Sequence, residues 1–315
     1  MLRRLLFSLL LLPLPASLQG CAGLPRDTRP FLVVLGTGQD AGIPQAGAFA
    51  HPGWKDASQQ RLVTCLGIVD PATGQEWMIE ATPDFRVQYY RLHGAGGAGP
   101  EMDLAGIFLT HAHIGHYTGL MFLGHESMSA PGIPVHVMPR MQAFLEHNGP
   151  WSQLVHYGNI TLQSLADGEA VVLTGGVRVT PFLVPHRQEY SEVVGFRIDG
   201  PETSVLFLPD IDSWEEWESE GILIEDLIAG VDVAYLDGTF FDNGEIPGRD
   251  MSGFPHPFIA RSMHRFSELP LSEREKIRFI HLNHTNPAQF PGSSARAMIR
   301  QHGMGVAEEM ERLPL

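Results

Sequence analysis

The sequence predicts an α/β protein in which a layered β-sheet core is covered by helices on its outside. Three observations support this class. The chain has 315 residues, of which 43% are hydrophobic, and this is enough to bury a large core. From Phe31 onward, apolar runs typical of strands alternate with helical patterns. No Pro/Ser-rich linker and no repeat divides this region, so we expect a single domain over residues 31–315.

The first half of this domain is expected to contain five strands and three helices. Apolar runs that end in Gly, Asp, Thr or Pro predict strands at 31–36, 61–70, 76–81, 104–110 and 133–139. Helical patterns predict helices at 84–93, from 116 to about 128, and at 140–148.

The second half begins with short strands and continues with alternating strands and helices. The short strands are predicted at 170–174, 177–186, 193–199 and 204–210. An acidic stretch at 213–230 has a helical pattern, and its charges are expected to face solvent. The remaining predicted elements are a strand at 232–240, a helix at 257–266, a strand at 276–284, a helix at 294–303 and a short strand near 305–310.

The N-terminus resembles an export signal. Two arginines precede an apolar run that is too short to span a bilayer, as in secretory signals. Cys21 follows "SLQG", which resembles the lipobox of bacterial lipoproteins, although Gln19 stands where a smaller residue is usual. We therefore expect a lipoprotein-type signal peptide at 1–20, lipid attachment at Cys21, a tether at 21–30 and a periplasm-facing membrane location. Ordinary cleavage nearby and an uncleaved anchor are the alternatives.

The charge of the chain limits its partners. The net charge is −15 and the pI is about 5.4. An acidic surface repels phosphate backbones, so we expect a small-molecule substrate and no nucleic acid. Contact with a membrane is expected only through the N-terminal lipid. The sequence specifies no oligomeric state.

A side chain of a kind that commonly binds metals, His or Asp, directly follows the apolar run of several predicted strands. Because strand ends converge at one edge of a sheet, where active sites form, we expect these side chains to lie near one another. They are Asp70, His111, His186, Asp210, Asp237 and His281.

The segment "HAHIGH" at 111–116 carries the most specific pattern. His111 and His113 alternate in an extended loop and can turn toward one point, while His116 approaches from the first turn of a helix. Zinc takes such nitrogen and oxygen ligands, and a catalytic zinc keeps one position for water. The metal lowers the pKa of that water toward ~7 and makes hydroxide available at neutral pH.

This segment resembles the His-x-His-x-Asp-His motif of the metallo-β-lactamase superfamily, with Gly115 in the Asp position. The resemblance implies an α/β (α+β) fold, a four-layer αβ/βα sandwich with zinc at one edge. It implies that Asp70 matches the structural Asp of the family and orients a ligand. The implied ligands of the first zinc are His111, His113, His186 and Asp210, and those of the second are His116, His281 and the bridging Asp210.

The glycine at position 115 makes the second zinc site uncertain. Glycine has no side chain that coordinates, so the site is expected to be weak or empty, because an anionic ligand is missing. Another residue can instead complete it. His284, three residues past His281, is the first candidate, and Asp40 and Asp212 are the others.

Further segments resemble one branch of the superfamily, coenzyme PQQ synthesis protein B. They are "LGTGQDAGIPQ", "ATPDFRVQ", "HLNHTNP" and "GVAEEM". That branch is similar to ribonuclease Z and to phosphonate-pathway phosphodiesterases, and "DGTF" at 237–240 with His256 is similar to their Asp-x-Thr-Phe and downstream His. The resemblance implies catalytic roles for His256, as general acid, and Asp210, with Asp237 and Asp40 near the metals.

These expectations combine into an exported zinc-dependent hydrolase. Metal-bound hydroxide would attack an ester, a phosphodiester or a related bond of a small molecule. Two alternatives remain open: an accessory or oxidative role like that of coenzyme PQQ synthesis protein B, and a metal-binding protein without turnover.

Overall fold

The computed structural model describes residues 28–96 and 103–315. The predicted signal peptide at 1–20, the lipidation site at Cys21 and most of the tether lie outside the described residues. Among the described helices, none has the length and apolar character needed to cross a membrane.

Two seven-stranded sheets form the centre of the molecule. The first has the order β14-β1-β2-β3-β4-β5-β6 and the second the order β13-β12-β11-β10-β9-β8-β7. The strands of the first sheet are β1 (Phe31–Gly36), β2 (Cys65–Asp70), β3 (Gln75–Ile79), β4 (Asp103–Phe108), β5 (Ile133–Val137), β6 (Ile160–Ser164) and β14 (Arg312–Pro314). Those of the second are β7 (Val171–Val172), β8 (Arg178–Leu183), β9 (Val194–Asp199), β10 (Ser204–Leu208), β11 (Val233–Asp237), β12 (Ile277–Ile280) and β13 (Gly305–Val306).

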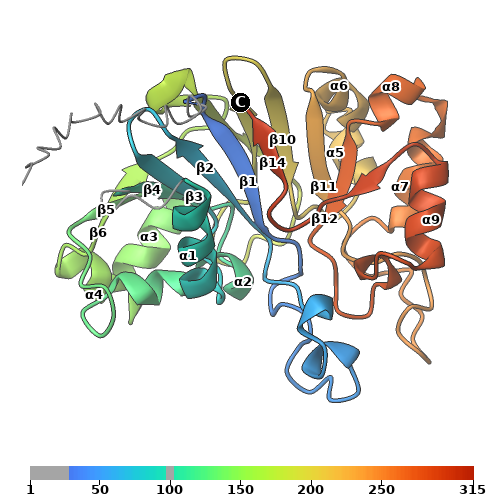
Figure 1. Ribbon diagram of the computed structural model, residues 1–315, viewed down its shortest axis with the longest axis horizontal. Helices are drawn as coiled ribbons and strands as arrows, with labels where there is room; N and C mark the ends of the chain where they lie inside the picture. Colours follow the sequence, from blue (N-terminus) through green and yellow to red (C-terminus); the bar gives the residue numbers. More distant parts are fainter. Residues whose placement is uncertain (1–27, 97–102) are drawn as a thin grey trace, which may run out of the picture.

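Helices cover the outer face of each sheet (Figure 1). The helices on the first sheet are α1 (Phe85–Ala95), α2 (Ile114–Tyr117), α3 (Pro139–His147) and α4 (Trp151–His156). Those on the second are α5 (Trp214–Ser219), α6 (Ile224–Ala229), α7 (Ile259–Arg265), α8 (Leu271–Arg274) and α9 (Ser294–Gln301).

Alternation along the strands separates the core into three layers. Leu32 and Val34 of β1 pack between the two sheets, against residues such as Phe196 and Phe207 of the second sheet. Val33, on the opposite face of β1, packs under the helices of the first sheet. An equivalent apolar layer lies between the second sheet and its helices. This arrangement of helix, sheet, sheet and helix confirms the predicted four-layer sandwich.

Strand direction decides which residues reach the functional edge. β2 is antiparallel to both β1 and β3, and β3 is parallel to β4. The carboxyl ends of β1, β3 and β4 therefore share one edge, and β2 ends at the opposite one. Asp70, at the end of β2, accepts hydrogen bonds from Ala72 N and Thr73 Oγ1 and stabilises the turn to β3. The prediction that Asp70 orients a metal ligand is therefore wrong.

The same edge is joined to the second sheet. A bridge between Gly38 and Leu282 connects the loop after β1 to the loop after β12. Val194 N donates to Thr110 O, which connects β9 to the loop after β4. Because β10, β11 and β12 are parallel, their carboxyl ends also meet there.

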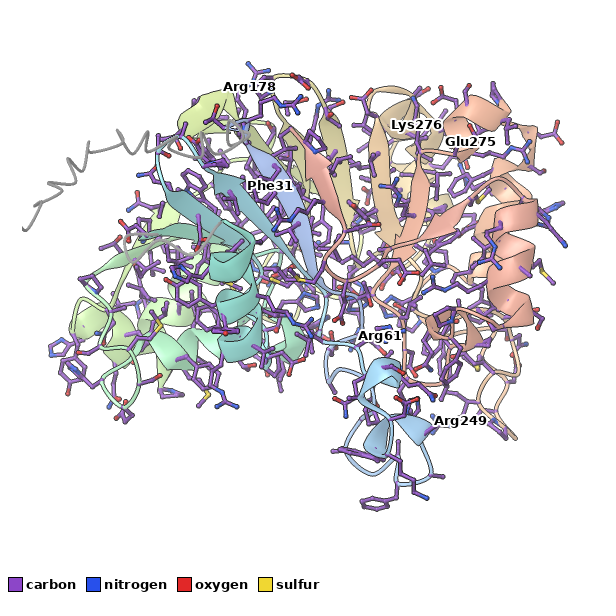
Figure 2. All side chains as sticks on the ribbon, in the orientation of Figure 1. Phe31, Arg61, Arg178, Arg249, Glu275 and Lys276 are labelled. Atoms are coloured by element: carbon purple, nitrogen blue, oxygen red, sulfur yellow. The ribbon has the colours of Figure 1, made fainter. Side chains whose placement is uncertain are left out.

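A small lobe of residues 43–60 projects beyond this edge (Figure 1, blue). Two hydrogen bonds between Ile43 and Arg61 close its base, with N–O distances of 2.9 Å. Figure 2 labels Arg61 at this base, where its guanidinium donates to the carbonyl oxygens of Ser58 and Gln289. The lobe therefore begins only three residues after Asp40.

Several predicted elements differ in extent from those observed. The helix expected from 116 to 128 is the short α2 followed by 3-10 turns at Thr118–Leu123. The acidic stretch at 213–230 forms two helices, α5 and α6, because Gly221 has a φ of 87° that ends the first. The apolar pattern of the sequence does not predict strands β6 and β14.

Candidate metal centre

Three histidines from two loops converge at the functional edge. His111 and His113 follow β4, and His186 follows β8. His113 Nδ1 lies 2.8 Å from His111 Nε2 and 3.2 Å from His186 Nε2. Asp210, which follows β10, places Oδ1 3.8 Å from His186 Nε2. The structure thus brings together the four residues expected at the first zinc.

A second group lies on the other side of Asp210. It contains His116 of α2, His281 after β12, and Asp40 from the loop after β1. Asp40 Oδ1 lies 3.1 Å from His116 Nε2 and 3.3 Å from His281 Nε2. Asp210 Oδ2 lies 3.2 Å and 3.5 Å from the same two nitrogens. The two oxygens of Asp210 therefore face the two groups separately.

In His111, His113 and His186, the ring nitrogen that points away from the other rings, here called the outer nitrogen, contacts an oxygen atom. His186 Nδ1 lies 2.7 Å from Asp212 Oδ1, and His113 Nε2 lies 3.0 Å from Glu189 Oε2. A carboxylate only accepts, so each of these outer nitrogens donates its proton. Their inner nitrogens then carry lone pairs. This is the arrangement in which outer partners orient metal-binding imidazoles.

Glu80 orients His116 directly and His111 through Thr110, although the sequence pattern alone did not reveal it. Its Oε1 accepts from Thr110 Oγ1 at 2.6 Å and lies 3.2 Å from His116 Nδ1. Since Thr110 donates to Glu80, its hydroxyl oxygen is left to accept from His111 Nδ1, 2.8 Å away. Glu80 is fully buried and has a φ of 84°. It ends the apolar run "WMIE", which was a signal as clear as the one at Asp70.

The inward-facing atoms fit a bound cation. The lone pairs of His111, His113 and His186 would repel one another at these distances if nothing positive lay between them. Asp210 Oδ2 is buried and has no hydrogen-bond partner among the residues that the structure describes. A divalent metal ion shared by the rings and Asp210 satisfies all of these atoms, and nitrogen and oxygen ligands suit Zn²⁺.

Charge at this edge also favours a cation. Burial alone would lower the pKa of His116, but Glu80, Asp210 and Asp40 raise it well above its ordinary value. Burial alone would raise the pKa of Asp210, but His281, His116 and His186 lower it well below its ordinary value. Burial also holds the pKa of His111 well below its ordinary value, which keeps its lone pair free. Asp210 thus remains ionised and attracts positive charge.

His256 lies beside both groups. Its Nδ1 is 2.7 Å from Asp237 Oδ2 and 3.7 Å from Asp210 Oδ1. Burial alone would lower the pKa of His256, but Asp237 and then Asp210 raise it to about 9. Thr239 Oγ1 donates to Asp237 Oδ1 and lies 2.9 Å from His281 Nδ1. The predicted pair of Asp237 and His256 is therefore adjacent to the ligand atoms.

Two of the three candidate substitutes for the missing Asp lie elsewhere. His284 belongs to none of the groups of converging ligand atoms found among the described residues. The Nδ1 atom of His284 is buried and has no hydrogen-bond partner among the described residues. Asp212 holds the outer nitrogen of His186. Asp40 is the candidate that reaches the ligand atoms of the second group.

Comparison with known proteins gives four main findings. Residues 76–283 match the family described as the beta-lactamase superfamily domain. "Coenzyme PQQ synthesis protein B" of Bradyrhizobium diazoefficiens is 24% identical over 309 residues, covering 87% of this chain and 96% of that protein. Zn²⁺-bound PqqB from Methylobacterium extorquens has a similar structure, with a TM-score of 0.71, 21% identity and coverage of 90% of this chain and 100% of that one. A diphosphatase from the PhnP family follows with a TM-score of 0.63, 22% identity and coverage of 90% and 96%.

Proposed function

Because the matched segment spans more than half of the chain, this protein belongs to the beta-lactamase superfamily, and we propose that it is a metal-dependent hydrolase of small molecules. The bond cleaved would be an ester, a phosphodiester or a related linkage. The observation that carries this proposal is Asp210, whose two oxygens face two separate groups of inward-facing ligand atoms.

The proposed ligands act from positions fixed by their outer hydrogen bonds. His111, His113, His186 and Asp210 would hold one Zn²⁺, and His116, His281 and Asp210 would contribute to a second. Bound zinc supplies a Lewis acid and lowers the pKa of water. Glu80, Glu189 and Asp212 hold the rings in the tautomers that ligation requires.

His256 is proposed to donate the proton that the leaving group needs. With a pKa of about 9, its ring is protonated at neutral pH. Its Nδ1 proton is held by Asp237, so Nε2 is the nitrogen available to a substrate oxygen. A buried, protonated imidazole next to the ligand atoms suits general-acid catalysis.

The charge and the N-terminus support proposals about substrate and location. The net charge of −15 favours a small substrate over a polynucleotide. We propose that the protein is exported, cleaved before Cys21 and anchored by a lipid at that cysteine. Labelling with radioactive palmitate tests this: wild type should be labelled and Cys21→Ser should not. Labelling of both proteins would contradict the anchor.

A second candidate function is a part in coenzyme PQQ synthesis. It is supported by the curated relative and the structural neighbour that carry this name and align along most of the chain. The chain would then restore PQQ production in a bacterium that lacks its own coenzyme PQQ synthesis protein B. If PQQ production is not restored, this second candidate is contradicted and the hydrolase stands as the proposed function.

Metal content and turnover together test the hydrolase. Purified protein should contain zinc and should cleave members of a panel of phosphodiesters, esters and lactones. His186→Ala should lose turnover and the zinc ion of the first site, whereas His264→Gln, which removes an exposed imidazole outside the site, should keep both. Zinc without turnover on any member would contradict the hydrolase and favour a metal-binding protein.

A further inference from the structure

Asp40 occupies the space that a side chain at position 115 would need. A Cβ built on Gly115 would lie 2.4 Å from Asp40 Cα, 2.6 Å from Asp40 Oδ1 and 2.8 Å from Asp40 Cβ. Such distances are far shorter than any van der Waals contact. A side chain at position 115 and Asp40 in its present place therefore exclude each other.

The backbone at Gly115 does not itself require glycine. The residue lies in the short helix α2 and does not have a positive φ. An alanine or aspartate would therefore be compatible with the backbone conformation. The close approach of Asp40 is what the missing Cβ permits.

The loop that carries Asp40 is held firmly against the strand that provides His281. Gln39 N donates to Leu282 O at 2.8 Å, and Gly38 N donates to Leu62 O at 2.8 Å. The side chain of Asn283 also donates to Gln39 Oε1. Two of these bonds come from the residues directly after His281, and all three hold Gly38 or Gln39 directly before Asp40, so they position the carboxylate beside that ring.

We infer that Asp40 supplies the carboxylate of a second metal site, in place of the Asp that the family motif carries at position 115. The site consists of Asp40, His116 and His281, with Asp210 Oδ2 shared with the first metal. The inference rests on the metal binding in the proposed function, and it does not depend on which bond is cleaved. We therefore expect each chain to bind two divalent metal ions, although Gly115 makes the family motif incomplete.

The unsatisfied oxygen of Asp210 supports this assignment independently. Oδ2 is buried without a hydrogen bond from any described residue, although the Nε2 atoms of His116 and His281 lie 3.2 Å and 3.5 Å away. Two carboxylates and two imidazole nitrogens that converge in this way are a ligand set for a divalent cation.

Zinc content measured by mass spectrometry on protein equilibrated with buffered zinc tests the inference. Wild type should bind two zinc ions per chain and Asp40→Ala about one. Asp40→Asn keeps the volume and should weaken the second ion more than the roughly 10- to 100-fold typical for loss of an outer-shell partner. Glu220→Gln, which removes an exposed carboxylate on the surface, is the matched control and should bind two.

Gly115→Ala gives a second test in which every proposed ligand is kept. Its Cβ would displace Asp40, so the variant should also bind about one zinc ion. Two ions in both Asp40→Ala and Asp40→Asn, or one ion in wild type and in every variant, would overturn the role of Asp40 and leave the first site intact. Wild type that binds no zinc would instead contradict the metal binding on which the proposed function also depends.

Discussion

His256 Nδ1 and Asp237 Oδ2 are joined by a hydrogen bond of 2.7 Å at the end of β11. Asp237 is fully buried, and its other oxygen accepts from Thr239 N and Oγ1. A carboxylate fixed in this way stabilises the imidazolium form of His256. It also explains why a histidine with a φ of 87° is held in this position.

The pair predicts how activity depends on pH. Since the pKa of His256 is about 9, the proton donor is present below that pH and is lost above it. Asp237→Asn removes the main cause of the raised pKa. The alkaline limb of the kcat profile should therefore move from about pH 9 in wild type to a lower pH in the variant. An unchanged limb would show that His256 does not supply the proton.

Glu80 is predicted to control metal affinity from outside the ligand set. Glu80→Gln removes the negative charge that holds His116 and Thr110, and we expect zinc affinity to fall by roughly 10- to 100-fold. Asp70→Asn is the matched control, because Asp70 lies in the turn at the opposite edge. Competition with a zinc chelator gives both affinities. Equal losses in the two variants would contradict the assignment.

A buried carboxyl away from the metal centre is predicted to make stability depend on pH. Burial raises the pKa of Glu76 to about 7, and neither of its oxygens has a hydrogen-bond partner within the described residues. The folded protein therefore holds a proton that the unfolded chain releases near pH 4.5. The protonated form is compatible with burial, so no stability is lost below the unfolded pKa, and stability falls as the pH rises toward and through 7.

Glu76→Gln should remove this loss. The free energy of unfolding of the variant should exceed that of wild type by on the order of 2 kcal/mol at pH 8, and by much less at pH 4.5. Urea denaturation at the two pH values measures the difference. A variant that is less stable than wild type at pH 8 would mean that the carboxylate has a partner in solution.

The sequence predicted the layers of the fold better than the direction of its strands. Asp70 and Glu80 both end apolar runs, and only the antiparallel pairing of β2 with β3 sends them to opposite edges. That pairing depends on the turn between the strands and on the whole sheet, so the apolar pattern alone could not reveal it. The edge strand β6 alternates weakly, and β14 has only three residues, which explains why neither was predicted.

The histidine positions were predictable because each follows a strand with a clear apolar pattern. The role of Asp40 was not decided in advance, since three residues could have replaced the carboxylate missing at position 115. Its choice depends on a contact between residues 75 positions apart, which local sequence patterns do not contain. The contact of Glu189 with His113 was equally hidden, and Asp212 was a candidate ligand but not a predicted partner of His186, because loops bring these residues together.

Anomalous X-ray diffraction at the zinc edge, from crystals grown with zinc, is the decisive test of the two-metal centre. We expect one peak among His111 Nε2, His113 Nδ1, His186 Nε2 and Asp210, and a second peak among Asp40, His116, His281 and the other oxygen of Asp210. Peaks only elsewhere on the protein, with these rings free of metal, would contradict it.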